Sequence, residues 1–379
     1  MKKFIALMLA AILVLGSAIP VLAIENSAAP AVENSATINI SIESIESIML
    51  SNSSNMALAK NNFDKAALTY QNALSDYNKV KKQYDALVLN TSADWAQALS
   101  LSNQLDSLRN NMNSAKFNLD AAQLIYNQQV QQFVLAAKQQ YLSYLSALTQ
   151  NQISAISLSS QENQLAGLMT KLTLGYVSKK QVDTFATQVS DLRTSFSNQE
   201  EQAKVLLEKL RSYMGILETA TVTVSNVVTF DFTSIPAIVF DSDLSVMLAN
   251  STDIKTKEIS LKSINKTASS SNDPSKYRYD IISAEISLSQ AKEKAKLDFQ
   301  DQYIALKNSD IALKAKIVKL NVKKTELAGM VLRAKLGFAS KKQVQDIQLE
   351  VKSQELQILM DQQNLYASFI RYNLTKLGY

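Results

Sequence analysis

Glycine and proline are so scarce in this sequence that the chain can make very few tight turns. Seven glycines and four prolines occur in 379 residues, where average usage would supply several times more. Because most tight turns and many helix ends need one of these residues, a chain that nearly lacks them must run in long continuous elements. Ala, Leu, Gln and Lys are abundant instead, and all four favour helix. The sequence therefore predicts an all-α protein built from long helices.

The first 23 residues have the features of a secretory signal peptide. Lys2 and Lys3 precede an apolar stretch, and residues 21–23 form a small-residue cleavage pattern. We expect cleavage after Ala23, followed by a flexible leader over residues 24–37, which is rich in Ala, Ser and Asn. No later stretch is apolar for long enough to cross a bilayer as a helix. The sequence predicts an exported protein of the cell envelope or cell surface.

Cysteine and histidine are both absent from the chain. Catalysis by Ser-His-Asp or Cys-His groups is therefore excluded, as are the common zinc sites. Acidic runs such as Glu200 and Glu201 are more typical of a solvated helix face than of a catalytic pair. Once the signal peptide is removed, basic and acidic residues nearly balance, which does not favour nucleic acid or an anionic membrane as the main partner. A metal site or a hydrolase built from carboxylates alone stays open in principle, but the sequence favours neither an enzyme nor a cofactor or metal site.

A nine-residue motif occurs twice and shows that the chain is a duplication. Leu-Gly-Tyr-Val-Ser-Lys-Lys-Gln-Val at 174–182 matches Leu-Gly-Phe-Ala-Ser-Lys-Lys-Gln-Val at 336–344, and 10 of 19 positions agree when the comparison starts at Gln164. The two openings also match, but at a longer spacing, which leaves 36 extra residues in the first copy. The organisation that we predict is a first helical-hairpin repeat at 38–218, a linker at 219–241 and a second repeat at 242–379.

Each repeat is expected to hold a shorter opening helix, a long helix that runs into the repeated motif, and a return helix. The 36 extra residues should lengthen the helices that flank residues 87–95, and the only strand-like alternation, at 220–232, belongs to the linker. The expected helices are about 41–89, 93–173 and 178–216 in the first repeat, and 242–268, 278–335 and 340–377 in the second.

The repeated motif predicts a tight turn between two helices. Its glycine suits the left-handed conformation that ends a helix, and its serine followed three residues later by glutamine forms a capping box for the next one. These residues are Gly175, Ser178 and Gln181 in the first copy, and Gly337, Ser340 and Gln343 in the second.

Two interpretations of these turns remain open. In the first, they only reverse the chain. In the second they bind a partner, because the aromatic residue of each motif, Tyr176 or Phe338, lies beside two lysines and has no part in making the turn.

The signal peptide, the duplication and turns of the form Leu-Gly-x-x-Ser-x-x-x-Val together resemble the TolC family of outer-membrane efflux and secretion channels. The Asn-Ser pair that follows each opening helix and the Leu-Gly pair near the end of each return helix are similar as well. The resemblance covers most of the chain after the signal peptide. It implies a homotrimer whose antiparallel coiled-coil hairpins form a hollow α-helical tunnel, and whose partners are an envelope adaptor protein and an inner-membrane pump.

The resemblance also assigns site residues by position. Adaptor docking falls to five residues at each tip, which are Leu174, Gly175, Tyr176, Val177 and Ser178, and Leu336, Gly337, Phe338, Ala339 and Ser340. The family has paired acidic residues just after the second tip that constrict the pore. Here those positions hold Gln343 and Asp346, and the first copy has Gln181 and Asp183 just after its own tip.

One departure from the family concerns the membrane. Family members insert two strands of about ten residues per repeat between the opening and long helices. In this chain residues 76–113 have a helical pattern, and 269–280 is too short for such a hairpin. We therefore expect the transmembrane strands to be absent. Two hypotheses follow: a conduit component that docks an adaptor for export, or a non-conducting structural coiled-coil protein of the envelope or surface.

Overall fold

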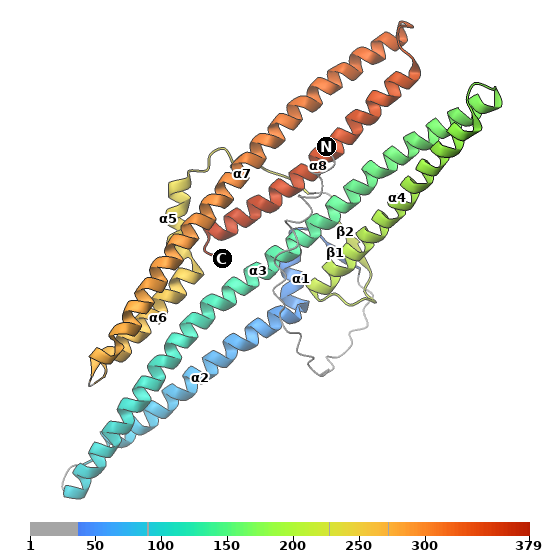
Figure 1. Ribbon diagram of the computed structural model, residues 1–379. Coiled ribbons are helices and arrows are strands. Elements are labelled where there is room, and N and C mark those ends of the chain that lie inside the picture. The colour runs from blue at the N-terminus through green and yellow to red at the C-terminus, as the bar shows by residue number, and fades with distance from the viewer. Residues whose placement is uncertain (1–36, 89–90, 227, 272) are drawn as a thin grey trace. The chain divides into compact units, whose positions relative to one another are not determined.

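Long helices make up most of the computed structural model, which describes residues 37–88, 91–226, 228–271 and 273–379 (Figure 1). Those residues form eight α-helices and two three-residue strands, which confirms the all-α fold class. The predicted signal peptide at 1–23 and all but the last residue of the predicted leader at 24–37 lie outside the described residues. The repeat boundaries stay predictions, and the elements of each repeat follow in the predicted order.

The first repeat contains α1 (Ile45–Asn52), α2 (Ser54–Asp85), α3 (Ser92–Thr173) and α4 (Lys179–Met214). The second contains α5 (Phe240–Asn250), α6 (Thr252–Ser269), a 3-10 helix (Pro274–Tyr277), α7 (Arg278–Lys335) and α8 (Lys341–Lys376). A parallel pair of strands, β1 (Ile38–Ile40) and β2 (Val222–Val224), joins the start of the first repeat to the linker. Among the described residues of the strand-like pattern at 220–232, a strand forms over Val222–Val224.

The prediction of one continuous opening helix per repeat is wrong, because each opening helix breaks at a serine. Ser53 and Ser251 take extended ψ angles of 118° and 121°, which end α1 and α5 and start α2 and α6. Each break lies against the last residues of the return helix of the same repeat. In the second copy the backbone N–H of Thr252 donates to the carbonyl of Gly378 at 2.9 Å.

A glycine makes each of these contacts close. At Gly215 a Cβ atom would lie 2.2 Å from the backbone oxygen of Asn52, and at Gly378 it would lie 2.2 Å from that of Asn250. Since real Cβ atoms do not approach oxygen that closely, only glycine fits either position without movement of the backbone. The Asn-Ser and Leu-Gly pairs, which the sequence shows as separate repeated features, are therefore the two sides of one contact.

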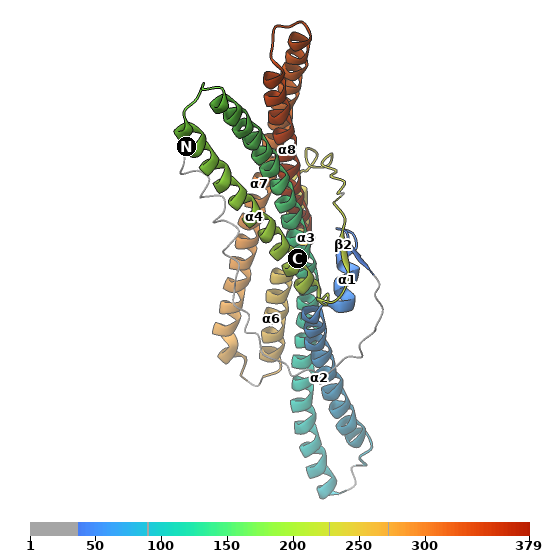
Figure 2. The ribbon, with the colours of Figure 1, turned by 90° about the vertical axis from the view of Figure 1, so that its right-hand side faces the viewer.

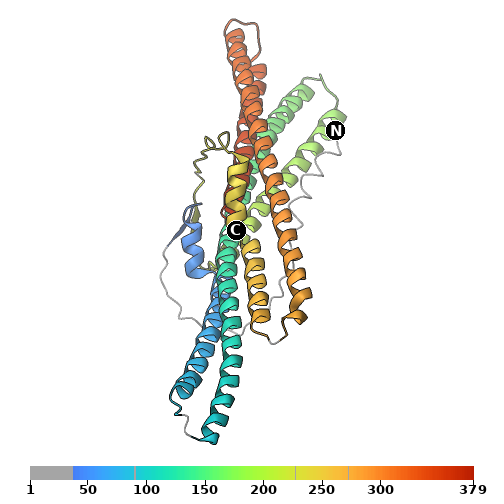
Figure 3. The ribbon, with the colours of Figure 1, turned by 90° about the vertical axis from the view of Figure 1, so that its left-hand side faces the viewer.

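The helices pair as antiparallel hairpins. α3 packs on α2 over its first part and on α4 over its second, and α7 packs in the same way on α6 and α8 (Figure 1). Figure 2 and Figure 3 show the α2–α3 hairpin from two opposite sides. α2 has 32 residues against 18 in α6, and α3 has 82 against 58 in α7. This confirms that the extra residues of the first copy lengthen the helices of this hairpin.

The two copies meet through α3. Within the described residues α3 contacts both α6 and α8 of the second repeat, and α7 makes no comparable contact with α2 or α4. One polar link at the α3–α8 contact is a hydrogen bond from the Ser146 hydroxyl to the amide oxygen of Gln363, whose side chain is buried. Pairing between the copies is therefore one-sided: α3 has a partner in the other repeat and its counterpart α7 does not.

Each repeat has an apolar core near the break in its opening helix. Tyr141 is wholly buried in the first core, where its hydroxyl donates to the carbonyl of Ser225 at 2.5 Å. In the second core the buried rings of Phe299 and Tyr372 stack with centroids 4.9 Å apart, and the Tyr372 hydroxyl donates to Asp243.

None of the described helices combines the length and the apolar character that a membrane-crossing helix requires.

Candidate functional site

The first tip joins α3 to α4 through a left-handed glycine. Gly175 has φ +78°, and its N–H donates to the carbonyl of Leu172 at 2.9 Å. The N–H of Tyr176 donates to the carbonyl of Lys171 at 2.8 Å. These two bonds satisfy carbonyls at the end of α3 and form a Schellman motif. A Cβ at Gly175 would meet no atom within 4 Å, so glycine is needed here for its backbone angle and not for space.

A capping box then starts α4. The Ser178 hydroxyl accepts from the backbone N–H of Gln181 at 3.3 Å, and the Gln181 side-chain oxygen accepts from the N–H of Ser178 at 3.0 Å. Val182 behind the cap is buried and Val177 before it is partly buried, as expected for a hydrophobic staple. The local sequence thus fixes where α3 ends and where α4 begins.

The second tip repeats this geometry. Gly337 has φ +82°, and the N–H of Phe338 donates to the carbonyl of Arg333 at 2.8 Å. Ser340 and Gln343 make the reciprocal capping bonds at 2.8 and 3.2 Å, and α8 follows. Two segments that lie 162 residues apart therefore build the same turn by the same bonds.

The apolar side chains of the tips are exposed to an unusual degree. Tyr176 is 78% exposed and Phe338 is 80% exposed, and Leu174 and Leu336 beside them are exposed as well. None of these four side chains makes the bonds that form the turn. Each tip therefore presents an aromatic and a leucine to solvent on a rigid backbone, which suits binding of a partner better than reversal of the chain alone.

Within a single chain, two of the predicted constriction residues contact residues that are close to them in sequence. The side chain of Gln343 is held by the cap of α8. The carboxylate of Asp346, one turn further on, accepts from the amine of Lys342 at 2.9 and 3.0 Å, and Asp183 is exposed on α4. Their predicted role at a pore stays a prediction, because a pore would need further copies of the chain.

A groove between α3 and α8 runs back from the tips. It has a volume of about 740 Å³, and a second hollow of about 350 Å³ continues it along the same two helices. Ser160, Asp346 and Leu349 line both. The lining mixes amide and hydroxyl side chains with leucines and charged groups, and lysines at 171 and 342 lie nearest the tips. The sequence did not reveal this groove, because it depends on the packing of one repeat against the other.

A stripe of exposed apolar residues follows the face of α7 that has no partner. Its members recur at intervals of seven and then four residues, which is the spacing of a coiled-coil seam. They are Leu297, Ile304, Ile311, Val318 and Val322. In a water-soluble helix such a seam is normally covered by another helix. No other described helix of this chain covers it to the extent that α8 covers α3.

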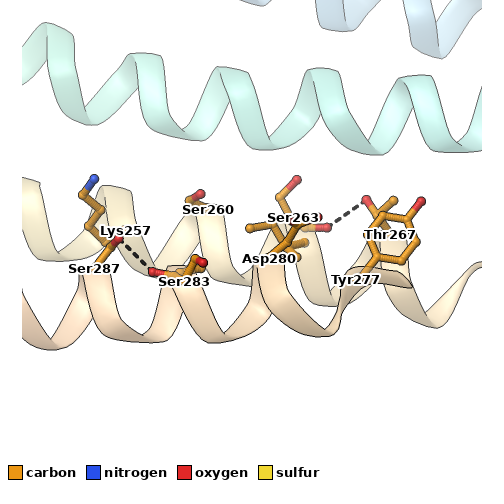
Figure 4. A pocket seen from close by; sticks show the side chains of 10 residues that line it. Lys257, Ser260, Ser263, Thr267, Tyr277, Asp280, Ser283 and Ser287 are labelled. Atoms are coloured by element: carbon orange, nitrogen blue, oxygen red, sulfur yellow. Dashed lines mark hydrogen bonds between the residues drawn. The ribbon is translucent and has the colours of Figure 1, made fainter. Parts of the chain in front are cut away.

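A third surface, between α6 and α7, is polar and open (Figure 4). It has a volume of about 490 Å³ and is lined mainly by hydroxyl groups. Two of these groups bond to their own helix: Thr267 donates to the carbonyl of Ser263, and Ser287 to that of Ser283. In the part of the chain that the structure describes, no cluster of three or more acidic residues could hold a metal ion. Neither observation indicates a catalytic or metal site here.

No protein-family model and no curated protein matches this sequence. Several solved structures match its fold. The CmeC outer membrane channel of Campylobacter jejuni has a TM-score of 0.64 at 11% identity, over 89% of this chain and 85% of that one. The outer-membrane channel OprN has a TM-score of 0.64 at 11% identity, over 89% of this chain and 90% of that one. The outer membrane protein VceC of Vibrio cholerae has a TM-score of 0.57 at 11% identity, over 89% of this chain and 96% of that one.

These matches extend over most of this chain and most of each similar chain. At these identities they establish the fold alone: the chain has the helical fold of the TolC-like outer-membrane channels.

Proposed function

We propose that this protein is the helical-tunnel component of a TolC-like export conduit and that its two tips dock an adaptor protein. The observation that carries the proposal is the repeated tip, in which the same bonds hold Tyr176 and Phe338 out in solvent. The likeness to outer-membrane channels supports a conduit in general. Its place would be the cell envelope, reached by export, and an inner-membrane pump would be the third component.

The one-sided pairing of the copies supports assembly into a closed ring. Within one chain α3 of the first repeat packs on α8 of the second. The equivalent contact of α7 would be with α4 of another copy, and the stripe at Leu297, Ile304 and Ile311 is the surface that this contact would cover. A contact between two different surfaces closes into a ring when the rotation allows it. The family resemblance sets the number of copies at three.

The α3–α8 groove supports docking at this end. An adaptor that inserts a helical hairpin would need an elongated groove beside exposed apolar anchors, and both lie next to the tips here. The docking residues of the proposal are the five at each tip named above. Asp183, Gln343 and Asp346 would lie just inside the same end, where three copies would bring them together as a constriction.

A second candidate function is a non-conducting structural coiled-coil protein of the envelope. The observation that favours it is the helical character of residues 76–85 and 92–113, where the family has strands. This function needs neither a ring nor an adaptor.

The mass of the purified protein separates the two candidates. A conduit should give three times the mass of one chain, and Ile304→Glu with Ile311→Glu should return it to the monomer. A clean monomer at micromolar concentration would refute the tunnel. For the tips, Tyr176→Ser with Phe338→Ser should abolish binding to an adaptor protein encoded beside the gene, while Leu58→Ser with Leu68→Ser on exposed parts of α2 should not.

A further inference from the structure

The net positive charge of the chain is concentrated at its two tips. The tip segments, residues 165–187 and 327–349, hold seven basic residues and two acidic ones. The other 333 residues hold 32 basic and 32 acidic residues, so the tips account for the whole formal charge of +5. We call the seven basic residues, all of them exposed, the basic tip cluster. They are Lys171, Lys179, Lys180, Arg333, Lys335, Lys341 and Lys342.

Little within the chain neutralises this cluster. The amine of Lys342 pairs with the carboxylate of Asp346 at 2.9 Å, and the other six cations have no ion-pair partner among the described residues. Further back on α7 the situation is different, because three lysines each pair with a carboxylate of α8. They are Lys316, Lys323 and Lys324. The second repeat thus pairs lysines along the body of its hairpin and leaves most of those at the tip uncompensated.

Helix dipoles account for only part of the cluster. Lys171, Arg333 and Lys335 lie in the last turns of α3 and α7, where the negative end of the dipole favours a cation. The Lys-Lys pairs at 179–180 and 341–342 stand instead in the first turns of α4 and α8, where the dipole favours an acid. Neither of these first turns contains an acidic residue. Both copies therefore place lysines where they weaken the helix, and a negative charge from outside the chain would offset that loss.

We propose that the adaptor's docking end is acidic and that its aspartate or glutamate carboxylates contact the basic tip cluster. This inference rests on the adaptor docking proposed above and names the chemistry of the partner. The amines of Lys179, Lys180 and Lys341 bind the carboxylates, and the side chains of Tyr176 and Phe338 pack against apolar residues of the same partner. Bonds between ions become stronger where neighbouring apolar side chains exclude water.

An acidic helix fits this surface better than a phosphate polymer does. Lys171 of α3 and Lys342 of α8 line the α3–α8 groove together with Leu168 and Leu349. A helix with carboxylates near its end and apolar residues behind them matches both parts of that lining. A phosphate chain would match the lysines alone, and it would leave the leucines and the aromatic of each tip in contact with water.

Charge reversal tests the proposal without loss of the fold. One variant combines Lys179→Glu, Lys180→Glu and Lys341→Glu, and it keeps Lys342 because that residue pairs with Asp346. Since the helix dipole favours glutamate in a first turn, this variant should unfold at a higher urea concentration than the unaltered protein. Its association with the purified adaptor encoded beside the gene, followed by biolayer interferometry at about 50 mM salt, should be at least about tenfold slower. A misfolded variant could not give both results.

Salt and a matched control locate the effect at the tips. At about 1 M salt, where the Debye length is about 3 Å, the variant and the unaltered protein should associate at similar rates. The control combines Lys65→Glu, Lys79→Glu and Lys262→Glu. It reverses the same number of charges on exposed lysines of α2 and α6 that have no ion-pair partner in the described part of the chain. The association rate of the control should change less than twofold.

The possible results separate this proposal from docking itself. If the unaltered protein does not bind the adaptor, docking is refuted and the acidic partner with it. If the charge-reversed variant binds at the unaltered rate, docking stands and the acidic partner alone is refuted. Lysines in place of the carboxylates at the adaptor's docking end should restore association of the variant. A single-stranded DNA 20-mer that binds the unaltered tips more tightly than the adaptor does would assign the lysines to a phosphate polymer and overturn the proposal.

Discussion

Alanine at Gly215 should destabilise the first repeat far more than alanine at the tip glycine, Gly175. The two residues have nearly the same backbone angle, with φ of +73° and +78°. A Cβ at Gly215 would lie 2.2 Å from the backbone oxygen and 2.7 Å from the carbonyl carbon of Asn52, whereas a Cβ at Gly175 would meet no atom within 4 Å. Alanine therefore has the same conformational cost at both positions, and a steric clash is added only at Gly215.

The expected magnitudes follow from these two terms. A left-handed backbone costs an L-residue about 1–2 kcal/mol, which is the whole loss expected for Gly175→Ala. At Gly215 the obstructing atoms belong to the backbone at the α1–α2 break, so no side-chain rotation can relieve the contact. Forcing an extra carbon into a packed site typically adds about 1–3 kcal/mol. Gly215→Ala should therefore cost about 2–5 kcal/mol in total.

Urea unfolding followed by helical circular dichroism measures both losses. Gly378→Ala repeats the test in the second copy, where the Cβ would lie 2.2 Å from the oxygen of Asn250. Gly167→Ala, in α3 with open space around it, is the control and should raise stability by about 0.5–1 kcal/mol. Equal losses for Gly175→Ala and Gly215→Ala would refute the close contact between the return helix and the break in the opening helix.

Three further predictions concern pH, the caps and a buried amide. Burial raises the pKa of Tyr141 to about 12, and burial with a hydrogen bond to Asp243 raises that of Tyr372. The unfolded chain releases these protons from about pH 10, so the urea concentration at the unfolding midpoint should be highest below pH 10 and should fall above it. The fall should be less steep in Tyr141→Phe. A midpoint that stays constant to pH 12 would contradict this. Ser178→Ala and Ser340→Ala should each cost about 1 kcal/mol in the same assay, and Thr→Ala changes elsewhere on α4 should not. The side-chain oxygen of Gln199 is buried without a partner among the described residues, so Gln199→Leu should stabilise by about 1–2 kcal/mol; a lower urea midpoint would contradict that reasoning.

The tips were predictable from sequence because everything that forms them is local. Gly175 sets the backbone angle, and Ser178 with Gln181 makes the capping bonds within four residues. The breaks at Ser53 and Ser251 were missed because they depend on a return helix more than 120 residues away along the chain. The cause of each break was present in the sequence as paired motifs, but no local rule connects an Asn-Ser pair with a distant Leu-Gly pair.

The contact between the copies could not be predicted for a different reason. α3 and α7 have similar sequences near the tips, yet within the described ranges α3 packs on helices of the other repeat and α7 has no comparable contact. A duplicated sequence suggests equal surroundings for both copies, but in this chain α7 has no contact equivalent to the one between α3 and α8 among the described residues. The α3–α8 groove and the exposed stripe on α7 both arise from this difference. The stripe has heptad spacing in the sequence, but that spacing does not tell which helix of the fold would cover it.

The duplication itself bears on whether the tips do more than turn. The two copies differ by 36 residues in hairpin length, yet 10 of 19 positions around the tips are identical. The turn requires only the glycine, the capping serine and glutamine, and the staple. It does not require Lys179 and Lys341, which bond to no other side chain in the described residues, nor an aromatic that is about four-fifths exposed. Both tips keep these features although the turn does not need them and the rest of the two copies has diverged. Binding of one partner to both tips explains this better than two independent turns do.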